Sequence, residues 1–143
     1  MDYTEAVYDH ALNPRNVGFI EEHDGLGTCG DPHCGDVVVM TIRVRDGRVA
    51  EVRFQVQGCG AAIATCSITT ELVTGKTVEE AAQLTDEDVA RALGGLPEPK
   101  LHCSNMAASA LHHALEDYRQ RHKTDLHDWR ALYQVRADAR GSP

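Results

Sequence analysis

The sequence predicts an α+β fold in which helices pack on one face of a small antiparallel, three-stranded sheet. Apolar and polar residues alternate over 38–45 and again over 50–57, which is the pattern of half-buried strands. Asp46-Gly47 stands between the two runs and favours a tight hairpin turn, because glycine tolerates the positive φ that such turns require. After residue 58 the apolar period changes from two to that of a helix, so helices follow the hairpin.

Two further elements complete the first half of the chain. An amphipathic helix is predicted over residues 3–12, and Asn13-Pro14 ends it because a residue before proline avoids the helical region. The glycine-rich stretch 25–35 leaves room for one short edge strand around 26–29, the third strand of the sheet. In the strand that returns from the hairpin, alternation points four side chains inward: Ala50, Val52, Phe54 and Val56.

The second half of the chain is predicted to be helical. Residues 61–73 are nearly all small or apolar, so we expect this helix to be buried. Apolar spacing or a capping pattern marks further helices over 77–84, 86–93, 104–121 and 125–135. We expect residues 1–136 to form a single domain and residues 137–143 to form a flexible C-terminal tail.

Composition excludes several function classes. The chain of 143 residues carries a net charge of −8, which argues against a nucleic-acid partner, because contact with phosphates requires a basic surface. No apolar run approaches the roughly 20 residues that span a bilayer, and the acidic start Met1-Asp2 is unlike a signal peptide. We therefore expect a cytoplasmic protein with neither a nucleic-acid nor a membrane partner.

Three of the five cysteines stand beside residues that suit metal chemistry. Cys34 precedes Asp36 by two residues, and Cys59 lies between two glycines. Cys103 directly follows His102. Antiparallel pairing of the hairpin brings the first two cysteines to one end of the sheet. Thiolate, imidazole and carboxylate donors that meet at one point form a soft-metal site with one weak ligand.

Helix ends should activate the thiols at this site. Cys59 and Cys103 each precede a predicted helix, whose positive end lowers the pKa of a nearby thiol. We expect Cys103 to be exposed, because it follows the rigid loop around Pro97–Pro99. Cys66 is expected in the core of the small-residue helix, whereas Cys29 is either a loop residue or an accessory thiol. The other histidines are expected to be surface or core residues.

Five short motifs occur in a fixed order within residues 1–121. They are Asn13-Pro14-Arg15-Asn16-Val17-Gly18, Cys34-Gly35-Asp36, Gly58-Cys59-Gly60-Ala61-Ala62, Thr70-Glu71-Leu72-Val73-Thr74-Gly75-Lys76 and Lys100-Leu101-His102-Cys103-Ser104. Together they resemble the IscU/NifU-type iron–sulfur cluster assembly scaffolds, a group with a SufE/NifU-like fold. One such motif alone would be weak, but the ordered set is highly specific.

The resemblance implies a function and its residues. The assembly site would consist of Cys34, Asp36, Cys59, His102 and Cys103 and would hold iron and a 2Fe–2S cluster, with zinc as an occupant of the cluster-free form. A cysteine desulfurase of the IscS/NifS type would deliver persulfide sulfur, with Cys103 as first acceptor. The other implied partners are an electron donor such as a ferredoxin, acceptor apo-proteins and a second copy of the chain in a homodimer. Such a protein is a scaffold and sulfur acceptor rather than a turnover enzyme.

Two departures from the family pattern matter. Scaffolds served by a dedicated Hsp70-type chaperone usually read Leu-Pro-Pro-Val where this chain has Leu96-Pro97-Glu98-Pro99, which puts that partner in doubt. Cys66 stands where relatives commonly carry Ser. It is expected about 10 Å deeper along its helix than Cys59, which is too far to share a small cluster. Lys100 is expected either to pair with Asp36 in the metal-free protein or to be a solvated loop residue.

A zinc-dependent sulfurtransferase of the SufU type is the alternative function, because the same set of Cys and Asp ligands holds zinc. SufU-like chains usually carry an insertion between the second and third cysteines and lack the His before the third. The gap of 44 residues and His102 both favour the scaffold. A purely structural zinc site is disfavoured, since such sites usually take four Cys or His ligands.

Overall fold

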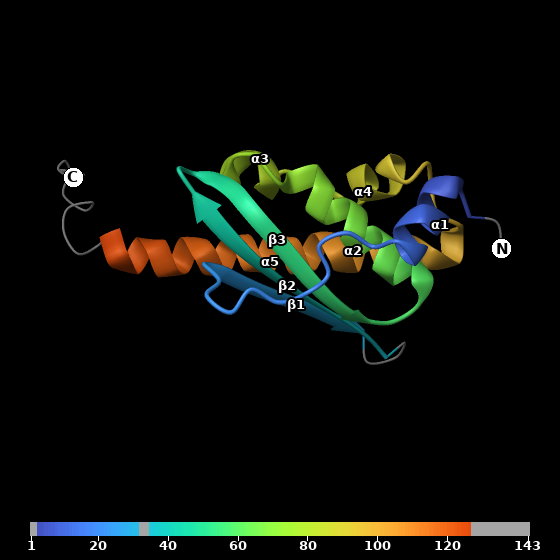
Figure 1. Ribbon diagram of the computed structural model, residues 1–143, viewed down its shortest axis with the longest axis horizontal. Coiled ribbons are helices and arrows are strands. Elements are labelled where there is room, and N and C mark those ends of the chain that lie inside the picture. The colour runs from blue at the N-terminus through green and yellow to red at the C-terminus, as the bar shows by residue number, and fades with distance from the viewer. Residues whose placement is uncertain (1–2, 32–34, 127–143) are drawn as a thin grey trace.

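The structure, a computed structural model, describes residues 3–31 and 35–126 and has the predicted α+β fold (Figure 1). Helices and strands follow one another along these residues in the predicted order. Their bounds are α1 Glu5–Leu12, β1 Gly25–Asp31, β2 Asp36–Arg45, β3 Arg48–Gln57, α2 Gly60–Val73, α3 Val78–Ala82, α4 Asp86–Ala92, the short 3-10 helix η1 Glu98–Lys100, and α5 Leu101–Leu126.

The sheet is antiparallel throughout, with its strands in the order β1-β2-β3. In the β2–β3 hairpin Val38 lies opposite Val56, and β1 pairs with the other edge of β2, where Cys29 lies opposite Val38. Asp46 and Gly47 take positive φ angles of 55° and 75°, which confirms the predicted tight turn. The hairpin therefore carries the start of β2 and the end of β3 to the same end of the sheet.

The inward orientation predicted for Ala50 is wrong. The pairing of β2 with β3 shifts between Arg43 and Val44. Near this shift Val49 and Val52 are buried while Ala50 is exposed. A β-bulge places one extra residue in a strand and so changes the alternation of side chains on its two sides.

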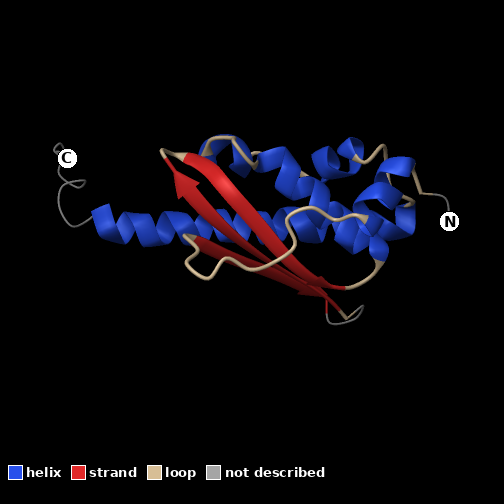
Figure 2. Ribbon diagram, viewed as in Figure 1, coloured by secondary structure: helices blue, strands red, loops and turns tan. Residues whose placement is uncertain are grey.

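Helices α2 and α5 cover the face of the sheet that the buried side chains of β2 and β3 line (Figure 2). Met40 and Phe54 from this face belong to one core cluster with Leu111 of α5, and each is at most 1% exposed. Strand β1 lies so close to α5 that a side chain at Gly25 or Gly27 would overlap with the helix backbone. These contacts hold α5 against the sheet along the middle of the helix.

Segment 13–24 covers part of the opposite face of the sheet. It first runs along the free edge of β3, where Asn16 O accepts a hydrogen bond from Phe54 N at 3.0 Å. It then crosses toward β1, and Ile20 N donates to Thr41 Oγ1 at 3.1 Å. Thr41 lies on the face that alternation turns outward, yet this segment buries it completely.

The long helix begins earlier than predicted. Helix α5 starts at Leu101 rather than Ser104, so Cys103 lies inside its first turn instead of before it. The predicted last helix over 125–135 lies almost wholly outside the described residues, and the predicted tail over 137–143 lies wholly outside them. Within the described residues, no helix combines the length and the apolar character that crossing a membrane requires.

Candidate metal centre

Three predicted ligands converge at one end of the sheet. Asp36 opens β2, Cys59 is the N-cap of α2, and Cys103 lies in the first turn of α5. One ligand atom from each of the three lies within 4.8 Å of the other two. Cys59 Sγ and Cys103 Sγ are 4.0 Å apart. Two sulfur donors and one carboxylate oxygen are therefore close enough to bind a single metal ion.

Of the other two predicted ligands, only His102 lies within the described residues. Cys34 lies outside the described residues. His102 lies beside the three converging residues, with its Nε2 3.7 Å from Cys103 Sγ. Its Nδ1 is 3.2 Å from the backbone oxygen of Pro99, and this carbonyl only accepts, so Nδ1 carries the proton. In the neutral ring Nε2 then keeps its lone pair, which is free to bind a metal or to accept a proton.

Cys59 is the more acidic of the two described thiols at the site. Burial raises the pKa of this thiol. The backbone N–H groups of Ala62 and Ala61 at the start of α2 act in the opposite direction, although Sγ forms no capping hydrogen bond. The Lys100 ammonium, 3.6 Å from Cys59 Sγ, also lowers the pKa, and the net result is a pKa below the usual value. Cys59 therefore favours the thiolate, as its place at a helix N-terminus predicts.

The contact of Lys100 corrects one prediction. No ion pair in the described part of the chain joins Lys100 to Asp36. The ammonium lies against the Cys59 sulfur instead, and that thiolate is the main cause of the raised pKa of Lys100. Sequence reasoning missed this contact, because residues 59 and 100 are joined only through the packing of α2 against the start of α5.

The exposure and the low pKa expected for Cys103 are wrong. Its residue is only 1% exposed, because it lies inside the first turn of α5 and packs with Ala61 and Ala62. Burial, followed by the negative charge of Cys59, raises the pKa of Cys103 to about 12. In the metal-free protein Cys59 is therefore the thiol that loses its proton first, and Cys103 holds its proton more tightly beside it. A metal that binds both sulfurs must displace this proton.

The two remaining cysteines lie outside this site. Cys66 is fully buried, which confirms the prediction that it is a core residue, and burial strongly raises the pKa of its thiol. Cys29 is half-buried on β1 and packs against the main core. Neither belongs to the group of converging ligands.

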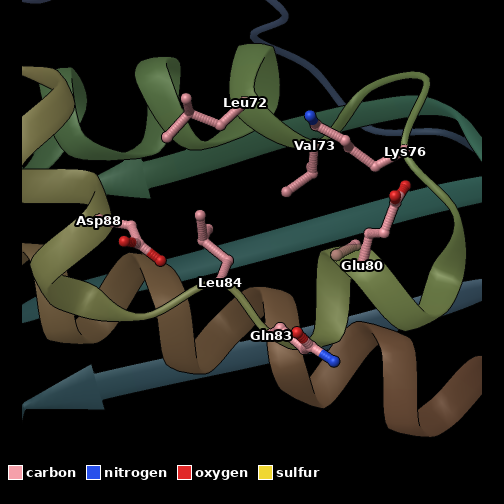
Figure 3. A pocket seen from close by; sticks show the side chains of 8 residues that line it. Leu72, Val73, Lys76, Glu80, Gln83, Leu84 and Asp88 are labelled. Atoms are coloured by element: carbon pink, nitrogen blue, oxygen red, sulfur yellow. The ribbon is translucent and has the colours of Figure 1, made fainter.

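A groove on another part of the molecule has no such donors. It lies between the end of α2, α3 and α4 and has a volume of about 310 Å³ (Figure 3). Leu72 and Leu84 line it together with Lys76, Glu80 and Asp88. No cysteine or histidine lines this groove, so it offers none of the sulfur or imidazole donors that suit a soft metal.

Comparison with known proteins places this chain in a family. The sequence matches the family model for the NifU-like N terminal domain over residues 2–125. This chain belongs to that family. The match covers the whole sheet and every helix except the last residue of α5, so the fold described above is that of a NifU-like N-terminal domain.

Individual relatives agree with this assignment. The chain is 55% identical over 116 residues to "Iron-sulfur cluster assembly scaffold protein IscU 1" of Archaeoglobus fulgidus, covering 81% of this chain and 76% of that protein. It is 44% identical over 125 residues to the scaffold protein IscU of Escherichia coli K12, covering 85% and 97%. A crystal structure titled as a putative scaffold protein for the SUF system, from Fervidobacterium islandicum, shares the fold with a TM-score of 0.64 at 22% identity, covering 79% and 96%.

Proposed function

We propose that this protein is a scaffold on which iron and persulfide sulfur are assembled into a 2Fe–2S cluster, which then passes to apo-proteins. The observation that carries the proposal is the convergence of one ligand atom each from Asp36, Cys59 and Cys103 within 4.8 Å. The archaeal and bacterial relatives, both named as cluster assembly scaffolds, support it. A scaffold of this kind holds its cluster as cargo and is not a turnover enzyme.

The donor set suits a cluster that has to leave. Thiolates are the usual ligands of iron–sulfur clusters, and Cys59 and Cys103 supply two of them, with Cys34 proposed as the third. Asp36 offers a hard oxygen donor, which binds iron in a cluster more weakly than a thiolate does. His102, whose Nε2 lies 3.7 Å from Cys103 Sγ, is the other candidate for the fourth ligand. Whichever of Asp36 and His102 is the fourth ligand, its exchange for a group of the acceptor protein opens the route by which the cluster is released.

Sulfur delivery requires the Cys103 thiol to lose its proton. The lone pair of His102 Nε2, 3.7 Å away, accepts that proton. The resulting thiolate attacks the outer sulfur of a persulfide on a cysteine desulfurase, so that one S–S bond forms on Cys103 while the S–S bond of the donor breaks. The desulfurase cysteine leaves as a thiolate. Because Cys103 is buried, the first turn of α5 has to open for this step.

Cluster formation then needs electrons and iron. Two electrons from a donor such as a ferredoxin break the new S–S bond and release the sulfur as sulfide, which binds iron at the site. The proposed partners are therefore a desulfurase, this electron donor and acceptor apo-proteins. The cytoplasm is the proposed location, and a homodimer is the proposed assembly.

Two incubations test this proposal. With desulfurase and cysteine but no iron, mass spectrometry of wild-type protein should find the added sulfur on Cys103, and persulfide mainly on Cys59 or Cys66 would contradict that assignment. With iron added under anaerobic conditions, charge-transfer absorption of a 2Fe–2S cluster should appear. The Cys59→Ser variant should form little cluster, whereas the matched Cys66→Ser variant should form it normally, because Cys66 lies outside the ligand group.

The alternative function is a zinc-dependent sulfurtransferase. Zinc also accepts two sulfur donors and a carboxylate oxygen, so the described ligands fit it as well. The same reconstitution separates the two functions. Zinc that stays bound while iron, sulfide and reductant are supplied, with persulfide but no cluster on the protein, would favour the sulfurtransferase.

A further inference from the structure

Gly58, the residue before Cys59, faces the carboxylate of Asp36. A methyl group at Gly58 would lie 2.9 Å from Asp36 Oδ1 and 3.0 Å from Asp36 Cγ. Its third neighbour would be Ala62 Cβ at 3.3 Å. All three neighbours are side-chain atoms, and the two nearest belong to a metal ligand. The space above Gly58 is therefore occupied by the carboxylate rather than by backbone.

We propose that Gly58 is a positioning residue of the metal centre, whose missing side chain allows the Asp36 carboxylate to lie beside the two sulfurs. This role rests on the metal centre of the proposed function, but on none of the steps of cluster assembly. Asp36 itself is only 8% exposed, so its carboxylate cannot move freely into solvent. The glycine thus decides where the single described oxygen ligand lies.

The size of the displacement indicates that it matters for metal binding. An ordinary contact of a methyl carbon begins near 3.4 Å, so the carboxylate would have to retreat by about half an ångström. Metal sites tolerate deviations of only about 0.2 Å in their ligand distances. A methyl group at this position would therefore remove Asp36 from the ligand group or distort the site.

The glycines of this chain differ in what a side chain would meet. At Gly25 and Gly27 the obstacle is the backbone of α5, which cannot move without the helix. At Gly58 the obstacle is the end of a rotatable side chain, so the fold should tolerate alanine there. Gly60, on the other side of Cys59, would meet only Ala11 Cβ at an ordinary 3.7 Å. Neither Gly58 nor Gly60 has a positive φ, so Gly60→Ala is a matched control.

The test uses Co(II) as the probe, because its visible absorption reports ligand type and geometry. In the metal-free full-length protein, Gly58→Ala should weaken Co(II) binding about tenfold, the usual scale for losing a residue that orients a ligand. Its ligand-field bands should change, while the midpoint of thermal unfolding should stay close to that of wild type. Gly60→Ala should match wild type in both measurements.

A double variant separates positioning from a general effect on the loop. If Gly58 acts through Asp36, then adding Gly58→Ala to Asp36→Ala should produce no further loss of Co(II) affinity. An equal loss in both backgrounds, a Gly58→Ala variant with wild-type affinity and spectrum, or the same loss in Gly60→Ala would overturn the proposal. A wild-type protein that binds Co(II) but assembles no cluster would overturn the proposed function and leave the role of Gly58 in place.

Discussion

Replacing Lys100 by alanine should raise the pKa of the Cys59 thiol. The ammonium lies 3.6 Å from Cys59 Sγ on a side chain that is partly exposed to solvent. At this separation and with the dielectric constant of water, two unit charges attract each other by about 1 kcal/mol. That energy corresponds to roughly 0.8 of a pKa unit. The N–H groups at the start of α2 remain in the variant, so part of the lowering should persist.

Alkylation of metal-free protein measures this shift. Short pulses of iodoacetamide between pH 5.5 and 10, followed by mass spectrometry of the peptide that contains Cys59, give the pH midpoint of its reactivity. The midpoint is the better readout than a rate at one pH, because a thiolate becomes intrinsically more nucleophilic as its pKa rises. We expect the Lys100→Ala midpoint to lie about 0.8 unit above that of wild type.

Lys76→Ala serves as the control, since Lys76 lines the groove of Figure 3 and no thiol lines that groove. It removes the same charge and should leave the midpoint unchanged. An unchanged midpoint in Lys100→Ala, or an equal shift in both variants, would refute the argument that the contact at 3.6 Å stabilises the Cys59 thiolate.

Three further outcomes follow from individual residues. Asp36→Ala should prolong the lifetime of a reconstituted cluster and slow its transfer, measured as the decay of its absorption with an acceptor present; faster loss than in wild type would contradict the weak-ligand role. Burial and then Arg15 lower the pKa of His10, so this imidazole takes up a proton more readily in the unfolded chain than in the folded protein. The free energy of unfolding of wild-type protein should therefore fall as pH drops below about 6.5, by at most about 1.4 kcal/mol per pH unit. In urea titrations His10→Gln should lose less stability over the same pH range. Gly27→Ala should lower the free energy of unfolding by about 2 kcal/mol or more, because its methyl group meets the backbone of α5, whereas a near-zero change would show that β1 and α5 separate easily.

The elements of the fold could be predicted because their signals are local. Alternation over the hairpin and the Asp46-Gly47 turn depend on neighbouring residues, and both predictions are confirmed. The orientation of Ala50 could not be predicted, because the bulge beside it arises from the pairing of two strands. Helix α5 starts early, directly after the short helix η1, and no residue pattern marked that short helix.

The residue types that make up the site could be predicted from the sequence, but the burial and placement of their side chains could not. The residue types beside Cys59 and Cys103 indicated metal chemistry, and the structure brings both together with Asp36. Burial of Cys103 was not predictable, because it results from α2 packing against the first turn of α5. The room that Gly58 leaves for the carboxylate depends on a residue 22 positions earlier in the chain, on the paired strand.

Metal and sulfide analysis of anaerobically purified protein, together with its absorption spectrum, tests the central claim most directly. Wild type and the Cys59→Ser and Cys66→Ser variants are each purified anaerobically and reconstituted with iron, cysteine and a desulfurase, and iron and sulfide are then measured in all three. We predict equal amounts of iron and sulfide with 2Fe–2S absorption in wild type and Cys66→Ser, and loss of both in Cys59→Ser. A cluster that persists in Cys59→Ser, or wild-type protein that holds zinc and no sulfide, would contradict a cluster assembled on the converging ligands.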